Sequence, residues 1–195
     1  MKNRTCAAFL FDGFADQELA LVMAGLNRTG TMLLETFSTR GRTVTSGSGL
    51  RVMPHAALSS MDPEDFDLLL LPGGAGGGRC GDQWERGDNL EVFPLIQASF
   101  GRRLVVAVGS AILSLADLGL LDTIPHTGPG TGYFSRYCPE YRGFASFCEQ
   151  PFVNAGPVIT IDSAALVERA HSMLGLFDTL QEIYANNHEL FDPAC

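Results

Sequence analysis

Apolar and polar residues in the first part of the chain follow two alternating patterns. Residues 6–11 form a continuous apolar run of strand length, and residues 16–29 place apolar side chains at helical spacing (Leu19, Val22, Met23 and Leu26). Residues 33–38 have the pattern of a second strand, and residues 43–46 and 50–53 flank Gly47 and Gly49 as in a small hairpin. The pattern predicts a strand, a helix, a strand and a hairpin in this order.

The middle of the chain repeats the alternation of strand and helix. Residues 67–71 hold four consecutive leucines and residues 104–108 are entirely apolar, which is typical of strands buried on both faces of a parallel sheet. Helices are expected at residues 91–100 and at residues 111–118, the second ending at Gly119.

The last part of the chain predicts a hairpin and a long helix. Residues 152–153 and 158–161 resemble a hairpin, and residues 164 to about 184 carry an apolar face at helical spacing. Strands that alternate with helices predict an α/β fold. We expect a three-layer sandwich in which a mostly parallel sheet, joined by right-handed crossovers, has helices on both faces.

Length and charge narrow the classes of function. A chain of 195 residues with 46% hydrophobic content is long enough for one substantial core, so we expect one domain. The net charge is −9 and the Lys and Arg residues are scattered, which argues against nucleic acid as a partner. No apolar run approaches the ~20 residues that span a bilayer, and no export signal is visible. We expect a soluble, cytoplasmic protein without a membrane partner.

Cysteine and histidine spacing gives no sign of a disulfide framework, a metal site or a cofactor. The five cysteines (6, 80, 138, 148 and 195) are odd in number and contain no C-x-x-C pair, which favours reduced thiols. None of the four histidines (55, 126, 171 and 188) lies three or four residues from a Cys or another His. The glycine run at 73–78 lacks the Lys-Ser/Thr ending of a phosphate-binding loop.

Three features converge on the carboxyl ends of the predicted strands. They are Glu18 at the start of the first helix, the Gly73-Gly74 turn after the four leucines, and a sharp strand-to-helix turn at residues 107–111. The last of these is shaped like a nucleophile elbow. In open α/β sheets, ligand sites lie at this edge.

The motifs around these features resemble the ThiJ/PfpI family, which belongs to the class I glutamine amidotransferase-like superfamily. The matching segments, in order, are DGFADQE at 12–18, LPGG at 71–74, VAVGSA at 106–111, LADLGLLD at 115–122, HT at 126–127 and VIT at 158–160. The resemblance covers about residues 4–178 and implies a flavodoxin-like fold and a homodimer. It makes residues 1–178 the family domain and residues 179–195 the helix end and tail of that domain.

The resemblance also implies roles for the residues at the elbow. In that family a cysteine nucleophile occupies the elbow, and counting back from Gly119 places Gly109 at the cysteine position and Ser110 at the following glycine. Glu18 matches the acid that hydrogen-bonds the cysteine sulfur. Gly73 and Gly74 form the turn in which the backbone N–H of Gly74, together with that of Ser110, would make an oxyanion hole. A glycine at position 109 preserves the tight turn but provides no nucleophilic side chain.

Each of these roles has a simpler structural alternative. Gly109 also suits any tight turn, Gly73-Gly74 also suits a strand end, and Glu18 also suits the start of a helix. Ser110 as a displaced nucleophile with His126 as its base competes with Ser110 as a helix-starting residue and His126 as a loop histidine. Cys80 reads as a loop thiol. His55 replaces an aspartate that is common in the family, with no assigned role.

Two functions from different classes follow. The first is a non-catalytic family member, in effect a pseudoenzyme, which binds a small polar or anionic metabolite in the family pocket or acts through protein contacts. The alternative is a cysteine-independent hydrolase or lyase of the amidase or glyoxalase type, which uses Glu18, His126 and the backbone oxyanion donors. The first is favoured because covalent catalysis requires the group that Gly109 lacks.

Overall fold

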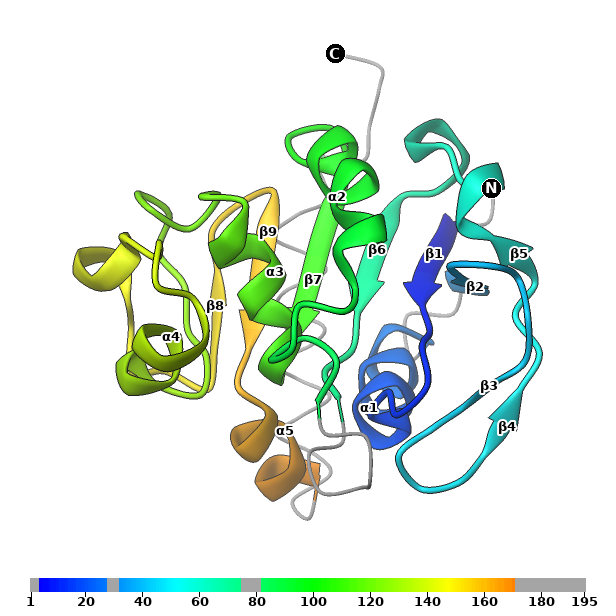
Figure 1. Cartoon of the computed structure of the whole chain (residues 1–195), viewed down its shortest axis with the longest axis horizontal. Helices are drawn as coiled ribbons and strands as arrows, with labels where there is room; N and C mark the ends of the chain where they lie inside the picture. The colour runs from blue at the N-terminus through cyan, green and yellow to red at the C-terminus, as the bar shows by residue number, and fades with distance from the viewer. Residues whose placement is uncertain (1–3, 28–31, 75–81, 171–195) are drawn as a thin grey trace.

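The computed structural model describes residues 4–27, 32–74 and 82–170. Its centre is a seven-stranded sheet in the order β5-β2-β1-β6-β7-β9-β8, parallel throughout except for the edge strand β8 (Figure 1). The strands of this sheet are β1 (Arg4–Phe9), β2 (Met32–Ser38), β5 (Ala56–Ala57), β6 (Leu68–Leu71), β7 (Leu104–Val108), β8 (Phe152–Asn154) and β9 (Val158–Ile161). A separate antiparallel hairpin pairs β3 (Val44–Thr45) with β4 (Arg51–Val52).

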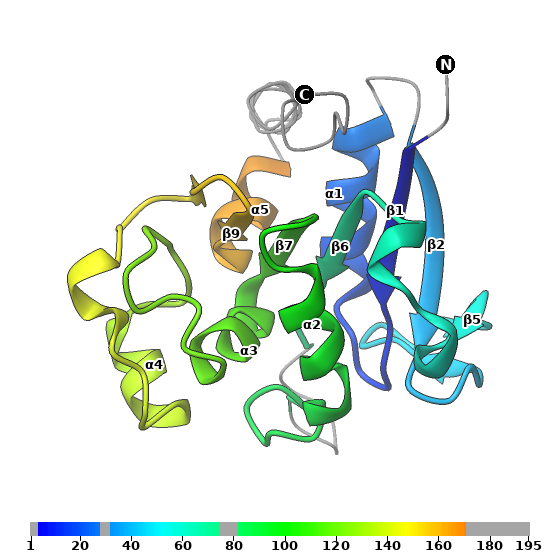
Figure 2. The ribbon, with the colours of Figure 1, turned by 90° about the horizontal axis from the view of Figure 1, so that it is seen from above.

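The helices lie on both faces of the sheet, which makes three layers (Figure 2). They are α1 (Asp16–Asn27), α2 (Phe93–Ser99), α3 (Ile112–Asp117), α4 (Thr131–Tyr137) and α5 (Ser163–Ala170). Helices α1 and α5 cover one face, and α2 and α3 cover the other. Short 3₁₀ turns at Leu58–Ser60, Pro63–Asp65, Leu90–Val92, Gly109–Ala111 and Gly143–Ser146 complete the described part.

The four leucines of β6 show why the central strands are apolar at every position. Leu69 and Leu71 belong to the apolar cluster under α2 and α3, whereas Leu68 and Leu70 belong to the cluster under α1 and α5. All four side chains are fully buried. Successive side chains of a strand point to opposite faces, so a strand covered on both sides needs apolar residues throughout.

The predicted α/β sandwich is confirmed, with its mostly parallel sheet and both hairpins. The expected helix at 91–100 begins as a 3₁₀ turn, and its α-helical part is Phe93–Ser99. The helix at 111–118 ends where Gly119 adopts a φ of +68°. Of the helix expected at 164–184, the structure describes Ser163–Ala170, and the boundary proposed at residue 178 lies outside the described residues. The short strand β5 and helix α4 were not predicted.

The carboxyl ends of β1, β6, β7 and β9 lie side by side, because these strands are parallel neighbours. From β1 the chain runs first to β2 on one side and later to β6 on the other, so the order of connections reverses between β1 and β6. A crevice forms at such a reversal point. The loops that leave these four strands carry the residues of the candidate site.

No helix in the described part of the chain is long and apolar enough to cross a membrane. Within the same residues, Cys6, Cys138 and Cys148 are free thiols, and no three His, Cys, Asp or Glu side chains form a group that could hold a metal ion. Cys80 and Cys195 lie outside the described residues.

Candidate functional site

Glu18 is a buried carboxyl group in the first turn of α1, with 2% of its surface exposed. Its Oε2 accepts a hydrogen bond of 2.7 Å from the backbone N–H of Gly73, and its Oε1 accepts one of 2.5 Å from the hydroxyl of Ser163. Burial raises the pKa of Glu18, the negative charges of Asp82 and Asp162 raise it further, and the two hydrogen bonds oppose this rise without cancelling it. Both carboxylate oxygens therefore already have partners from within the chain.

Gly109 is the first residue after β7 and starts the turn that leads into α3. Its φ of +56° lies in the left-handed region, which glycine adopts without the steric cost that a Cβ brings. A Cβ at this position would lie 3.0 Å from the Cβ of Ser163 and 3.1 Å from Oε1 of Glu18. The space above Gly109 is thus occupied by Ser163 and Glu18.

Neither Gly73 nor Gly74 has room for a side chain, because neighbouring carboxyl groups lie too close to both residues. A Cβ on Gly73 would lie 2.9 Å from Oε2 of Glu18, and one on Gly74 would lie 2.5 Å from Oδ1 of Asp82. The backbone N–H of Gly74 donates a hydrogen bond of 2.9 Å to the hydroxyl oxygen of Ser110. One of the two amides expected to form an oxyanion hole therefore has an acceptor from the elbow itself.

His126 lies in an aromatic cluster apart from the elbow residues. The ring is fully buried and meets Phe134, Tyr141 and Phe147 edge to face, with centroids 5.6–5.9 Å apart. Nδ1–H donates to the carbonyl of Ile124 at 2.7 Å, which leaves Nε2 to accept the hydroxyl of Tyr141 at 2.5 Å. Burial lowers the pKa of His126, so the neutral ring is favoured.

The structure thus brings together Glu18, Gly73, Gly74, Gly109 and Ser110, but it does not join His126 to them by a hydrogen bond. Each ring nitrogen of His126 is already used by Ile124 or Tyr141. A general base must reach the proton that it removes, and in this arrangement the basic nitrogen accepts the proton of Tyr141 instead.

Two residues of the site were missed by sequence reasoning. Ser163 follows β9, the parallel neighbour of β7, and starts α5 at the same edge of the sheet as Gly109. Its place directly after a strand end was the available signal. Asp82 is 4% exposed, packs against Gly74 and accepts the backbone N–H of Trp84 at 2.8 Å. Asp82 follows the glycine-rich loop, and no motif or periodicity at this position distinguishes it from other polar loop residues.

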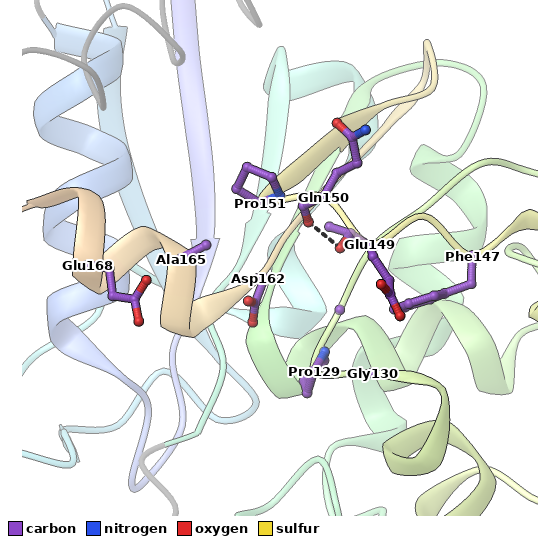
Figure 3. Close-up of a pocket in the computed structure, with 11 residues that line it drawn as sticks. Pro129, Gly130, Phe147, Glu149, Gln150, Pro151, Asp162, Ala165 and Glu168 are labelled. Atoms are coloured by element: carbon purple, nitrogen blue, oxygen red, sulfur yellow. Dashed lines mark hydrogen bonds between the residues drawn. The ribbon is translucent and has the colours of Figure 1, made fainter.

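An open cavity of about 430 Å³ adjoins the start of α5 (Figure 3). Asp162, which precedes Ser163, and Ala165, two residues after it, belong to its wall, and Glu168 extends the same side (Figure 3). Across the cavity lie Phe147 and Glu149. The rest of the wall is Thr127, Gly128, Pro129, Gly130, Gln150 and Pro151. Among the residues that the structure describes, the wall therefore carries three carboxyl groups and no Lys, Arg or His, and its volume suits a small molecule.

The other residues singled out in the sequence lie away from these contacts. His55 follows β4, and its Nδ1 accepts the backbone N–H of Thr36 at 3.1 Å. Cys138 is buried, and burial raises the pKa of its thiol to about 12, the opposite of an activated nucleophile. Burial likewise raises the pKa of Cys6. Neither thiol has the environment of a substitute for a cysteine at the elbow.

Comparisons with known proteins agree with the fold. The model of the DJ-1/PfpI family matches residues 4–170. The uncharacterized protease YoaZ of Bacillus subtilis (strain 168) is 26% identical over 188 residues, which are 91% of this chain and 85% of that protein.

Solved structures of family proteins superpose over nearly the whole chain. The DJ-1 superfamily protein Atu0886 from Agrobacterium tumefaciens is 30% identical with a TM-score of 0.74, and the match covers 94% of this chain and 98% of that one. The thiJ/pfpI family protein from Bacillus anthracis is 25% identical with a TM-score of 0.76, and the match covers 95% and 91% of the two chains.

Proposed function

The chain belongs to the DJ-1/PfpI family, and we propose that it is a non-catalytic member that binds a small molecule without thiol chemistry. The observation that carries this proposal is the contact between Ser163 and Glu18 above a glycine. Resemblance assigns position 109 to the cysteine nucleophile and Glu18 to its hydrogen-bond partner. Here position 109 has no side chain, and the Ser163 hydroxyl takes Oε1 of Glu18.

The arrangement of Ser110 supports the same proposal. An oxyanion hole works when preorganised N–H donors face the atom where negative charge develops. The Gly74 N–H already donates to the Ser110 hydroxyl, so a substrate oxygen would have to displace that bond. The elbow is therefore both without a nucleophile and closed by its own hydroxyl groups.

The cavity beside α5 supports a ligand that is neutral or positively charged. Glu149, Asp162 and Glu168 line it, and no basic residue offsets them within the described part of its wall. A carboxylate about 4 Å from an anion repels it by ~1 kcal/mol in water and by ~4 kcal/mol at an effective dielectric constant of 20. A millimolar complex has only about 4 kcal/mol of binding free energy, so this repulsion is decisive. The proposal therefore drops the anionic metabolite that the sequence left open.

The competing function is a cysteine-independent hydrolase or lyase that uses Glu18 and His126. It would need His126 to release Tyr141 or Ile124, and it would need the Gly74 N–H to release Ser110. Glu18, the remaining member of that set, already accepts a hydrogen bond from the hydroxyl of Ser163. A turnover assay separates the two functions.

The assay compares wild type with Gly109→Cys on amide and glyoxal substrates. The proposal expects no turnover by wild type above the buffer rate, and any activity that appears should require a cysteine at position 109. Turnover by wild type would contradict it. Wild-type binding is tested in parallel by thermal shift with small amines and with carboxylates of similar size, and amines should give the larger stabilisation.

The resemblance further supports a homodimer and a cytoplasmic location, and we propose both. Sedimentation equilibrium across micromolar concentrations should give twice the 21.0 kDa mass of the chain. A mass that stays at one chain over the whole range would contradict the dimer.

A further inference from the structure

We infer that positions 109 and 163 are alternatives: the side chain of Ser163 takes the volume and the hydrogen-bond acceptor that a side chain at position 109 would use. The nucleophile site is therefore latent and closed by Ser163. Substituting both residues, and not Gly109 alone, should reopen the nucleophile site. This inference rests on the proposed function, since it explains how a member without the elbow nucleophile keeps Glu18 buried.

The space that a side chain at position 109 would need is already occupied by Ser163. A Cβ at position 109 would lie 3.0 Å from the Cβ of Ser163 and 3.6 Å from its Oγ. A carbon–carbon separation of 3.0 Å is well inside normal contact, because attraction between such atoms is optimal at about 3.5–4.0 Å. The Ser163 Cβ belongs to the first residue of α5, so it moves only with the helix. Rotation of the Ser163 hydroxyl would not relieve this contact, because it involves the Cβ. Removal of the whole Ser163 side chain would relieve it.

Ser163 also occupies the oxygen of Glu18 that faces position 109. The Ser163 hydroxyl donates to Oε1, the same oxygen that lies 3.1 Å from the Cβ position at residue 109. The other oxygen, Oε2, is held by the Gly73 N–H. A polar side chain at position 109 and the Ser163 hydroxyl would therefore compete for the same oxygen of Glu18.

The backbone at Gly109 still has the conformation of a nucleophile elbow. Gly109 keeps a φ of +56° at the end of β7, and Glu18 stands directly beside it. A buried carboxyl that holds its proton can donate a hydrogen bond to a neighbouring thiolate and so stabilise the thiolate. Once the space is free, a cysteine at 109 should be reactive.

The experiment compares Gly109→Cys with the double variant Gly109→Cys, Ser163→Gly. The probe is iodoacetamide: the thiolate sulfur attacks the methylene carbon, the carbon–iodine bond breaks, iodide leaves, and the thiol proton goes to solvent. Mass spectrometry of the peptide that contains residue 109 separates this thiol from the five native cysteines. We expect the double variant to react about tenfold faster than the single variant at pH 7.

Two matched variants control for indirect effects. Gly109→Cys, Ala164→Gly places the new glycine at the exposed neighbouring position of α5 and should react like Gly109→Cys. Gly109→Cys, Ser163→Ala removes the hydroxyl but keeps the obstructing Cβ, so it should fall between the single and double variants. Equal rates for Gly109→Cys and the Ser163→Gly double variant would overturn the inference.

A second measurement applies if Gly109→Cys does not fold. The urea midpoint of Gly109→Ala should rise when Ser163→Gly is added, although Ser163→Gly alone should lower the midpoint of wild type. An unchanged or lower midpoint would also overturn the inference. Turnover by wild type, or labelling of its Ser163 by a fluorophosphonate, would instead contradict the proposed function, so the two failures are distinct.

Discussion

The Ser163 hydroxyl donates a hydrogen bond to Oε1 of Glu18, a residue 145 positions earlier in the chain. The contact exists because Glu18 follows β1 and Ser163 follows β9, and both strands end at the same edge of the parallel sheet. Gly109 lies beside this contact, and its missing side chain leaves room for it. The properties of the elbow follow from this relationship.

The first prediction concerns the pH dependence of stability at Glu18. Its pKa is raised in the folded state above the ordinary value of 4.5 for a glutamate side chain, so folding favours the protonated carboxyl. The stabilisation from proton uptake is complete below pH 4.5 and is lost as the pH rises through the folded-state pKa. Wild type should therefore lose stability relative to Glu18→Gln as the pH rises through this window.

Glutamine is the matched control because it resembles the protonated acid. Its amide oxygen can accept from Gly73, and its NH₂ group can donate to Ser163. Urea unfolding of both proteins between pH 4 and pH 8 measures the difference. A constant difference across this range would show that Glu18 does not titrate differently in the folded and unfolded states.

The second prediction concerns the buried pair of His126 and Tyr141. Tyr141→Phe leaves Nε2 of a fully buried ring without its donor, and an unsatisfied buried polar atom costs about 1–3 kcal/mol of unfolding free energy. Tyr137→Phe removes a hydroxyl from a half-buried neighbour and should cost less than about 0.5 kcal/mol. Chemical denaturation at pH 7.5 compares them, and equal losses would contradict a structural role for the pair.

The third prediction concerns the Gly74 amide. Ser110→Ala removes its acceptor and should reduce the unfolding free energy by about 0.5–1.5 kcal/mol. Hydrogen exchange at Gly74 should become faster, since the amide is no longer protected. The control is Ser114→Ala, whose hydroxyl donates to the carbonyl of Ala111 and leaves Gly74 untouched. If Gly74 exchanges equally fast in both variants, Ser110 is not its acceptor in solution.

The fourth prediction concerns the charge of the ligand. Glu149→Gln, Glu168→Gln removes two of the three carboxylates of the cavity at exposed positions and should leave the fold intact. Affinity for a small amine should fall about five- to thirtyfold, as expected if each lost charge contributes about 0.5–1 kcal/mol. Titration calorimetry measures this affinity at low and high salt. Amine binding that is indifferent to both the substitutions and the salt would place the ligand elsewhere.

The fold could be predicted from sequence largely because burial on two faces leaves a strong pattern. The four leucines at 68–71 fill both faces of a central strand, as their uninterrupted apolar pattern predicts. Strand β5 has only two residues, and α4 follows Gly130 in a loop without helical periodicity, so neither gives a comparable signal.

The candidate site was only partly predictable, for a physical reason. Resemblance located Glu18, Gly74, Gly109 and Ser110, which are near one another in the structure. It could not show that hydroxyl groups of Ser110 and Ser163 take the hydrogen-bonding positions at the elbow, because a hydrogen bond across 145 positions leaves no local pattern. Nor could it show that His126 accepts a hydrogen bond from Tyr141, since a catalytic histidine and a structural histidine look the same in a sequence.

We propose that the closed elbow performs no catalysis, and a turnover assay of wild type and Glu18→Gln side by side is the decisive test. Glu18 is the titratable group at the elbow on which the competing mechanism depends. Between pH 5 and pH 8, amide and glyoxal substrates should be consumed in the presence of either protein no faster than in buffer alone. A wild-type rate above the buffer rate that Glu18→Gln abolishes would contradict it.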